Sequence, residues 1–249
     1  MKARIKFAKY GVIRFIGHLD LMRYFQKAMR RAAIDIAYSE GYNPHQIMSF
    51  ASPLGLGITS DGEYLDISLN SDIEKEDIIN ALNAQMVDGV KILDFVKLKD
   101  DAKKSMSKVA AADYIVKIKD DYLDSDFIGK EKTFEEKFND FMAQEEIIIL
   151  KKSKKTESEV NIKPMILEYS FENKLGNDSV IDNFDNNYYV YFKVQAGSVT
   201  NLKPELIMEA FCNYVSKEYN KYTYQVHRLD MYATDDNNEL KPLSLVDIR

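Results

Sequence analysis

The chain has 249 residues, of which 45% are hydrophobic and 30% are charged, and its net charge is −6. This composition is too apolar for a disordered chain, and the length allows one or two packed domains. No apolar run reaches the roughly 18–20 residues that a membrane span requires. The first ten residues carry charges where a signal peptide needs an apolar stretch, so we expect a cytoplasmic protein that does not contact membranes.

Cysteine and histidine are too few for the common metal sites. The single Cys212 cannot form an internal disulfide, and an iron–sulfur cluster or a structural zinc site needs several thiolate or imidazole ligands. The three histidines, His18, His45 and His227, are scattered along the chain. We therefore predict no metal and no cofactor.

Positive charge is concentrated near the N-terminus. Residues 1–50 contain nine Lys or Arg and three Asp or Glu, whereas the rest of the chain is acidic. Because electrostatic fields act over about a Debye length, an acidic protein of this kind can carry a local anion-binding surface. The alternative is that these cations only solvate exposed helix faces.

Hydrophobic periodicity predicts alternating strands and helices in the first hundred residues. In the segment 19–33, Leu19, Met22, Phe25 and Met29 recur at intervals of three or four, which indicates an amphipathic helix. A second helix is predicted over 73–86, and strands are predicted over 3–11, 34–39, 45–52, 63–69 and 90–98.

The second half of the chain repeats this order. Pro204 opens a predicted helix, because proline fits the first turn of a helix. The segments 160–173 and 187–196 are predicted to pair as strands. The remaining predicted elements are a helix over 134–144 and strands over 113–119, 145–155 and 223–233.

Two copies of the order β-α-β-β-α-β predict an α+β fold of two tandem ferredoxin-like domains. The first domain is placed at 1–99, with an elaborated central hairpin, and the second at 111–249. The segment 100–110 lacks periodicity and mixes charges with small polar residues, so it is predicted to be the linker.

The predicted helix 19–33 carries a row of cations. Arg23, Lys27 and either Arg30 or Arg31 follow one another at spacings of three or four, so they share one helix face. Such a row can contact phosphates by neutralising their charge. A solvated helix face that binds nothing has the same pattern.

Two histidines flank the unit formed by this helix and the following hairpin. His18 lies near the start of the helix and His45 follows a turn; if their imidazoles meet, they can act as an acid and a base near neutral pH. A turn histidine that bonds only to a backbone carbonyl is the alternative. The neighbours suited to binding an anion or an aromatic ring are Arg14, Tyr38, Tyr42, Asn43 and Ser49.

The rest of the chain offers weaker signals. The glycines of "PLGLG" (53–57) lack the spacing of a nucleotide-binding loop. The cluster "LKKSKK" (150–155) suits nucleic acid or a hairpin tip, and "NYYVYFKV" (187–194) can stack bases or pack against helices. No role is predicted for His227 or Arg228.

Residues 15–69 resemble the opening of the radical-SAM-linked proteins, a bacterial domain family of unknown function. The resemblance is carried by "HLDLMR", "AYSEGYNPH", "SF" and "PLGLG" followed by "EYLDI", with a weaker match at "VNIKPMI" (160–166). Gly17 departs from the pattern, because a hydroxyl residue is expected there.

The resemblance implies a partner and assigns no catalytic residue. Members of the family are fused to radical SAM proteins or encoded beside one. A radical SAM enzyme holds its cluster with three close cysteines, and this chain has one. The resemblance therefore implies the stand-alone accessory of a separately encoded radical SAM protein.

Our first hypothesis is a substrate-binding accessory protein whose basic helix and 38–57 hairpin face RNA or another anionic substrate. The alternative is a metal-independent RNA-processing endoribonuclease that uses His18 and His45, by analogy with tandem ferredoxin-like endonucleases of CRISPR systems. A third hypothesis is that the loop motifs serve only the packing of the protein.

Overall fold

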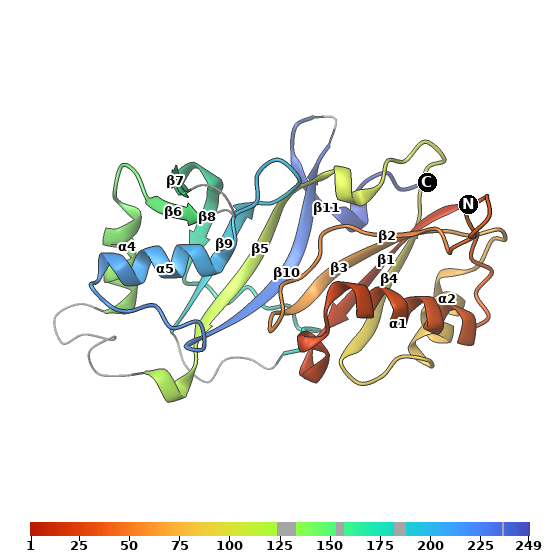
Figure 1. The fold of residues 1–249 in the computed structure, drawn as a ribbon, viewed down its shortest axis with the longest axis horizontal. Coiled ribbons are helices and arrows are strands. Elements are labelled where there is room, and N and C mark those ends of the chain that lie inside the picture. Colours follow the sequence, from red (N-terminus) through yellow and green to blue (C-terminus); the bar gives the residue numbers. More distant parts are fainter. Residues whose placement is uncertain (124–132, 153–156, 182–187, 236) are drawn as a thin grey trace.

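The computed structural model describes residues 1–123, 133–152, 157–181, 188–235 and 237–249. The chain forms a mixed α+β fold around a large, mostly antiparallel sheet, so the predicted fold class is confirmed at that level. Figure 1 shows an elongated molecule, with α1 and α2 beside β1 to β4 at one end and α4 and α5 beside β5, β8 and β9 at the other.

In the first half, the sheet has the strand order β4-β1-β3, and the short β2 pairs with the end of β3. All of these pairs are antiparallel. The elements are β1 (Lys2–Lys9), the 3₁₀ turn η1 (Gly11–Phe15), α1 (His18–Arg31), β2 (Met48–Phe50), β3 (Thr59–Ser68), α2 (Lys75–Asn83) and β4 (Val90–Lys97).

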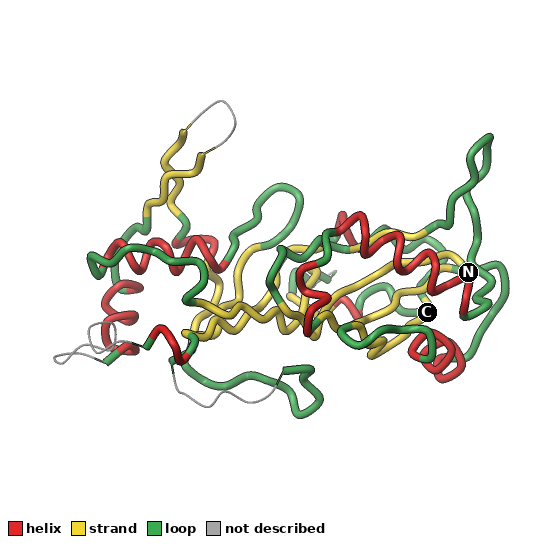
Figure 2. The backbone as a smooth tube through the Cα atoms, turned by 60° about the horizontal axis from the view of Figure 1, so that its bottom comes forward, coloured by secondary structure: helices red, strands yellow, loops and turns green. Residues whose placement is uncertain are grey.

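The second half has the strand order β10-β5-β9-β8, again with antiparallel neighbours. The predicted pairing of two strands across a polar excursion is thereby confirmed for β8 and β9. The elements are β5 (Val109–Ile118), α4 (Phe134–Met142), β6 (Ile148–Lys152), β7 (Glu157–Asn161), β8 (Ile166–Ser170), β9 (Tyr189–Gln195), α5 (Pro204–Tyr214), β10 (Tyr224–Thr234) and β11 (Leu240–Pro242). The hairpin β6–β7 is a separate two-stranded sheet that projects from this half (Figure 2).

The two halves share one sheet, because β10 pairs in parallel with the start of β3. Gly62 of β3 lies against the partner backbone so closely that a Cβ atom there would sit 2.4 Å from Asp230 Cα. A side chain at this position would push the two strands apart. Glycine is therefore required by the close approach of β3 and β10.

Charged side chains are buried at the junction of β3 and β10. Arg228, which is 2% exposed, donates to both carboxylate oxygens of Glu63, and His227 lies between Asp61 and Thr59. The His227 ring nitrogens are each 2.9 Å from their partner oxygens. His227 and Arg228 thus have structural roles that the sequence did not indicate.

The predicted linker 100–110 contains the 3₁₀ turn η2 (Ser105–Ser107) and the first two residues of β5. Ser105 is fully buried, and its backbone N and its hydroxyl both donate to the Asp66 carboxylate. The C-terminal segment also returns to the first half, where Arg4 donates to the carbonyls of Leu243 and Val246. These contacts tie the 100–110 segment to β3 and the C-terminal segment to β1.

Each half has its own apolar core. Phe7, Phe25 and Phe50 form the centre of the first core, with ring centroids 4.8–5.9 Å apart. Phe138 and Phe211 lie at the centre of the second core, 4.8 Å apart. Ile5 and Phe7 of β1 lie in the first core, and Phe134, Phe138 and Phe141 of α4 lie in the second.

Several local predictions are wrong in detail. Leu19 is 62% exposed, because the buried face of α1 is formed by Leu21, Phe25, Ala28 and Met29. The segment 34–39 forms only isolated bridges, and the strand predicted over 45–52 shortens to β2. The strand predicted over 160–173 is broken by a 3₁₀ turn that starts at Lys163 and contains Pro164.

Candidate nucleic-acid interface

The two histidines proposed as an acid–base pair have different surroundings. His18 packs edge-on against Phe50, with ring centroids 5.2 Å apart. His45 is exposed, and its Nδ1 lies 2.9 Å from the Ser39 hydroxyl, which also accepts from the His45 backbone N. Within the described residues, no hydrogen bond links the two imidazoles.

The cations of α1 lie on the solvent side of the helix. Arg23, Lys27 and Arg30 are exposed, and Arg23 forms an exposed ion pair with Asp20 at 3.4 Å. Arg31 instead donates to the carbonyl of Gln85, near the end of α2. Both arginines predicted as alternatives are therefore exposed, and Arg31 is the one that also contacts the end of α2.

The 38–47 hairpin is held to α1 by a buried amide. Gln46 is 4% exposed, and its Nε2 donates to the Gln26 carbonyl and to the Tyr38 hydroxyl, both at 3.3 Å. Tyr38, Tyr42 and Asn43 are exposed on this hairpin. These three side chains are therefore accessible to solvent on the surface of the hairpin.

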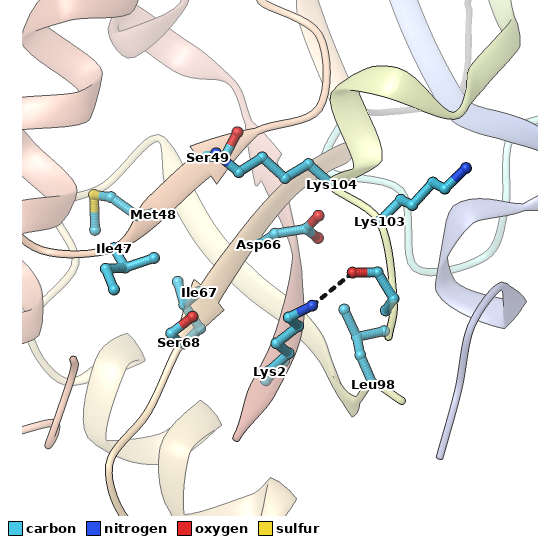
Figure 3. Close-up of a pocket in the computed structure, with 12 residues that line it drawn as sticks. Lys2, Ile47, Met48, Ser49, Asp66, Ile67, Ser68, Leu98, Lys103 and Lys104 are labelled. Atoms are coloured by element: carbon cyan, nitrogen blue, oxygen red, sulfur yellow. Dashed lines mark hydrogen bonds between the residues drawn. The ribbon is translucent and has the colours of Figure 1, made fainter. Parts of the chain in front are cut away.

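Ser49 lines a different pocket, of about 180 Å³, between β2 and the 98–104 segment (Figure 3). The Asp66 carboxylate in this pocket already accepts from Arg4 at 2.8 Å and from Ser105. Lys2 also lines it and donates to the Ala102 carbonyl at 2.9 Å. Lys2 and Asp66 therefore hold the 98–105 segment in place.

Arg14, by contrast, lines a cleft of about 410 Å³ between the two halves. One wall is formed by Arg14 and Phe15 of η1 and by residues 56–58, and the other by residues from the α5–β10 region. The first wall is fixed by a backbone hydrogen bond of 2.9 Å from Gly57 N to the Arg14 carbonyl. Gly57 has φ +84°, a conformation that glycine adopts without strain.

Exposed aromatic rings line this cleft on both sides. Phe15 is 62% exposed and Tyr222 is 60% exposed. Lys119 donates to the Tyr222 carbonyl at 2.7 Å and so holds that loop. Deeper in the cleft, Tyr219 stacks on Tyr224 with ring centroids 5.7 Å apart and an angle of 13°. The cleft therefore presents flat rings that a planar ligand can contact.

Two cations accompany the rings. The Arg14 guanidinium lies 4.9 Å from the Phe15 ring centroid, and the Lys221 ammonium lies 5.0 Å from that of Tyr222. Neither takes part in an ion pair within the part of the chain that the structure describes. Aromatic faces combined with cations bind the bases and phosphates of single-stranded nucleic acids.

Burial and nearby acids affect the tyrosines in the cleft. Burial raises the pKa of the Tyr219 hydroxyl, and the carboxylates of Glu205 and Glu209 raise it further. Burial also raises the pKa of Tyr224, whose hydroxyl lies 3.0 Å from Cys212 Sγ. Both hydroxyls are therefore neutral at physiological pH and add no negative charge to repel phosphates.

A larger groove of about 880 Å³ has mixed charge. There the Asp113 carboxylate accepts from the hydroxyls of Tyr191 and Tyr232, and burial raises its pKa. Lys174 and Lys193 lie 4.0 Å from the centroids of these two tyrosine rings. Tyr191 is 2% exposed and five aspartates line the groove, so it is a poorer surface for stacking bases and for binding phosphates.

The aromatic strand predicted as a stacking platform is largely internal. Tyr191 is 2% exposed and Phe192 is fully buried, as expected for a strand that packs on helices, while Tyr188 and Tyr189 are partly exposed. The basic cluster predicted at 150–155 lies mainly outside the described residues.

Among the residues of the cleft, the sequence singled out Arg14, and it included Leu56 and Gly57 only as part of the 38–57 hairpin. Phe15 and Tyr222 are separated by more than 200 residues, and no local pattern connects them. The available signal was Gly57 within "PLGLG", which marks a tight turn but does not indicate what the turn faces. The cleft forms only when β3 and β10 pair and bring the two halves together.

The described residues hold neither a cluster of metal ligands nor a membrane-spanning helix. They contain no group of three or more His, Cys, Asp or Glu side chains placed to hold a metal ion. None of their helices has the length and hydropathy needed to cross a bilayer.

A comparison with protein families matches residues 2–204 to a bacterial family described as "Uncharacterized protein conserved in bacteria (DUF2344)". No curated protein matches the chain.

Proposed function

Because this chain belongs to the DUF2344 family, whose description gives no activity, we propose a function from its surface: it binds single-stranded RNA and presents it to a separate radical SAM enzyme. The observation that carries the RNA part is the cleft lined by exposed rings and by two cations, Arg14 and Lys221, that form no ion pair with the described residues. The resemblance of residues 15–69 to radical-SAM-linked proteins supports the enzyme partner.

The architecture fits this proposal. Each half has four antiparallel strands in an order expected for a ferredoxin-like module, β4-β1-β3-β2 and β10-β5-β9-β8, with two helices. We therefore propose two ferredoxin-like modules joined edge to edge, the second with the β6–β7 hairpin inserted. The cleft lies where they meet, so it needs both modules.

Fluorescence anisotropy with a labelled single-stranded oligoribonucleotide tests RNA binding. The variant Arg14→Gln/Lys221→Gln removes two phosphate contacts, so the slope of log affinity against log salt should fall by about 1.4. Lys103→Gln/Lys104→Gln removes the same charge at exposed lysines that line the pocket of Figure 3, and it should leave binding unchanged. Equal losses in both variants, or no binding by the wild type, would count against the cleft.

The enzyme partner is tested by co-purification with a radical SAM protein encoded in the same genome, with and without RNA. A complex is expected, and the absence of a complex under both conditions refutes the accessory role. The same RNA, run on a denaturing gel after incubation, also tests the endoribonuclease hypothesis. Cleavage that His18→Ala and His45→Ala abolish would favour it, and uncleaved RNA would exclude it.

A further inference from the structure

An apolar patch of four exposed side chains, Val12, Phe15, Leu19 and Leu56, lies around the start of α1. Their exposed fractions are 76%, 62%, 62% and 66%. Val12 and Phe15 are three residues apart in the 3₁₀ turn η1, so they share one face of it, and Leu19 is in the first turn of α1, which begins soon after η1. Phe15 and Leu56 also line the cleft, so the apolar patch is continuous with the edge of the cleft.

Two of these residues serve neither the core nor the cleft. Val12 and Leu19 are absent from the apolar core of the first half and from the lining of the cleft. Their aliphatic side chains offer no ring for stacking a base and no group for a phosphate. Exposed apolar side chains that gather in one place mark sites of interaction with other proteins, and such side chains are stabilised when an apolar surface covers them.

Positive charge lies beside the apolar patch. Leu19 and Arg23 are four residues apart on α1, and Lys27 and Arg30 continue the same exposed face. The only ion pair printed for this row within the described residues, Arg23 with Asp20, is exposed and long at 3.4 Å, and such pairs contribute little. The row therefore favours a partner that carries carboxylates.

A second copy of this chain fits the surface less well. In a symmetric dimer the same face of both copies would meet, so the cations of α1 would lie against the cations of the other copy. Like charges that face each other across an interface repel. An acidic surface of a different protein has no such penalty.

We infer that the apolar patch and the cations of α1 dock the radical SAM partner through an apolar surface flanked by acidic side chains. This inference rests on the accessory role in the proposed function. Because the apolar patch borders the cleft, an enzyme docked on it lies next to RNA held in the cleft. The enzyme and the RNA then occupy adjacent surfaces and bind at the same time.

Biolayer interferometry with the purified radical SAM protein tests the inference. Val12→Ser/Leu19→Ser should weaken enzyme binding by at least about tenfold, because apolar surface is no longer buried. Its RNA anisotropy should stay unchanged, since neither residue lines the cleft. The matched control is Val199→Ser/Leu245→Ser, which removes a valine and a leucine that are 97% and 62% exposed elsewhere, and it should bind the enzyme as the wild type does.

A second variant tests the charge of the partner. Arg23→Glu/Lys27→Glu should slow association with the enzyme and reverse its dependence on salt, because charges at the edge of an interface mainly affect the association rate. An unchanged association rate would overturn the assignment of an acidic partner. Thermal melting by circular dichroism, unchanged from the wild type, shows that each variant is folded.

The outcomes separate the inference from the proposed function. Wild-type affinity for the enzyme in Val12→Ser/Leu19→Ser overturns the inference and leaves the accessory role standing. An equal loss in the control, or a joint loss of RNA binding, also overturns it. If the wild type binds no radical SAM protein, the accessory role fails and the inference fails with it, while RNA binding is decided by anisotropy alone.

Two other occupants of the apolar patch are distinguished by the same variants. A wild-type dimer that Val12→Ser/Leu19→Ser dissociates, measured by light scattering, would assign the patch to a second copy. Sedimentation of the wild type with phosphatidylglycerol vesicles, lost in this variant while enzyme binding is kept, would assign it to a lipid surface. Either result overturns the inference.

Discussion

Replacing Gly62 with alanine should destabilise the protein by disturbing the junction of its two halves. The added Cβ would lie 2.4 Å from Asp230 Cα and 2.5 Å from the Leu229 carbonyl oxygen, both backbone atoms. Ordinary contact begins near 3.4 Å, so β3 and β10 must separate by about 1 Å. Rotamer changes cannot relieve this clash.

Overpacking of a buried site typically costs about 1–3 kcal/mol. Because the added Cβ would meet backbone atoms, we expect Gly62→Ala to cost about 3 kcal/mol, the upper end of this range. For a protein of this size, that loss lowers the melting temperature by about 6–12 °C. Circular dichroism during urea and thermal unfolding measures both quantities.

Gly176→Ala is the matched control. Nothing lies within 4 Å of a Cβ built at Gly176, so this variant should be neutral or slightly stabilising through the entropy of the unfolded chain. A Gly62→Ala protein within about 0.5 kcal/mol of the wild type would refute the close approach of β3 and β10.

Two further predictions concern the charges at the same junction. Glu63→Gln leaves the Arg228 guanidinium buried without a carboxylate, so it should lower the free energy of unfolding in urea by about 3–5 kcal/mol. Adding Arg228→Met should restore most of the lost stability. Failure to restore it would contradict the ion-pair explanation. Burial raises the pKa of Asp61, but the hydrogen bond and charge of His227 lower it by more, so its net pKa lies below the usual value. A lowered folded-state pKa gives stability that is present above about pH 4 and is lost as the pH falls through the folded pKa. Asp61→Asn should therefore flatten the acid side of the stability profile, and a profile as steep as that of the wild type would contradict this assignment.

Local patterns in the sequence predicted most elements because amphipathicity is a local property. The alternation in β1 places Ile5 and Phe7 in the core, and the spacing of Phe134, Phe138 and Phe141 gives the buried face of α4. The predicted apolar stripe of α1 begins two positions too early, because Leu21 rather than Leu19 is its first buried residue. A helix end offers too few turns for the periodicity to fix the buried face.

The candidate site was harder to predict because it depends on contacts between distant segments. The exposed row of α1 and the hairpin residues could be proposed from spacing, yet Ser49 lines one pocket and Arg14 another. Tyr222 and Glu205 join Arg14 only through the folding of the second half onto the first. The spacing of residues along the sequence does not indicate which distant residues come together in the fold.

The pairing of β3 with β10 also constrains the order of folding during synthesis. His227 pairs with Thr59 across 168 residues, so the start of β3 has no partner on that edge until nearly the whole chain has left the ribosome. Contacts between such distant residues form slowly, and an open strand edge can pair with other chains in the meantime. The nascent protein therefore passes through a period in which its first half is prone to aggregation, and that period ends only when β10 has been synthesised.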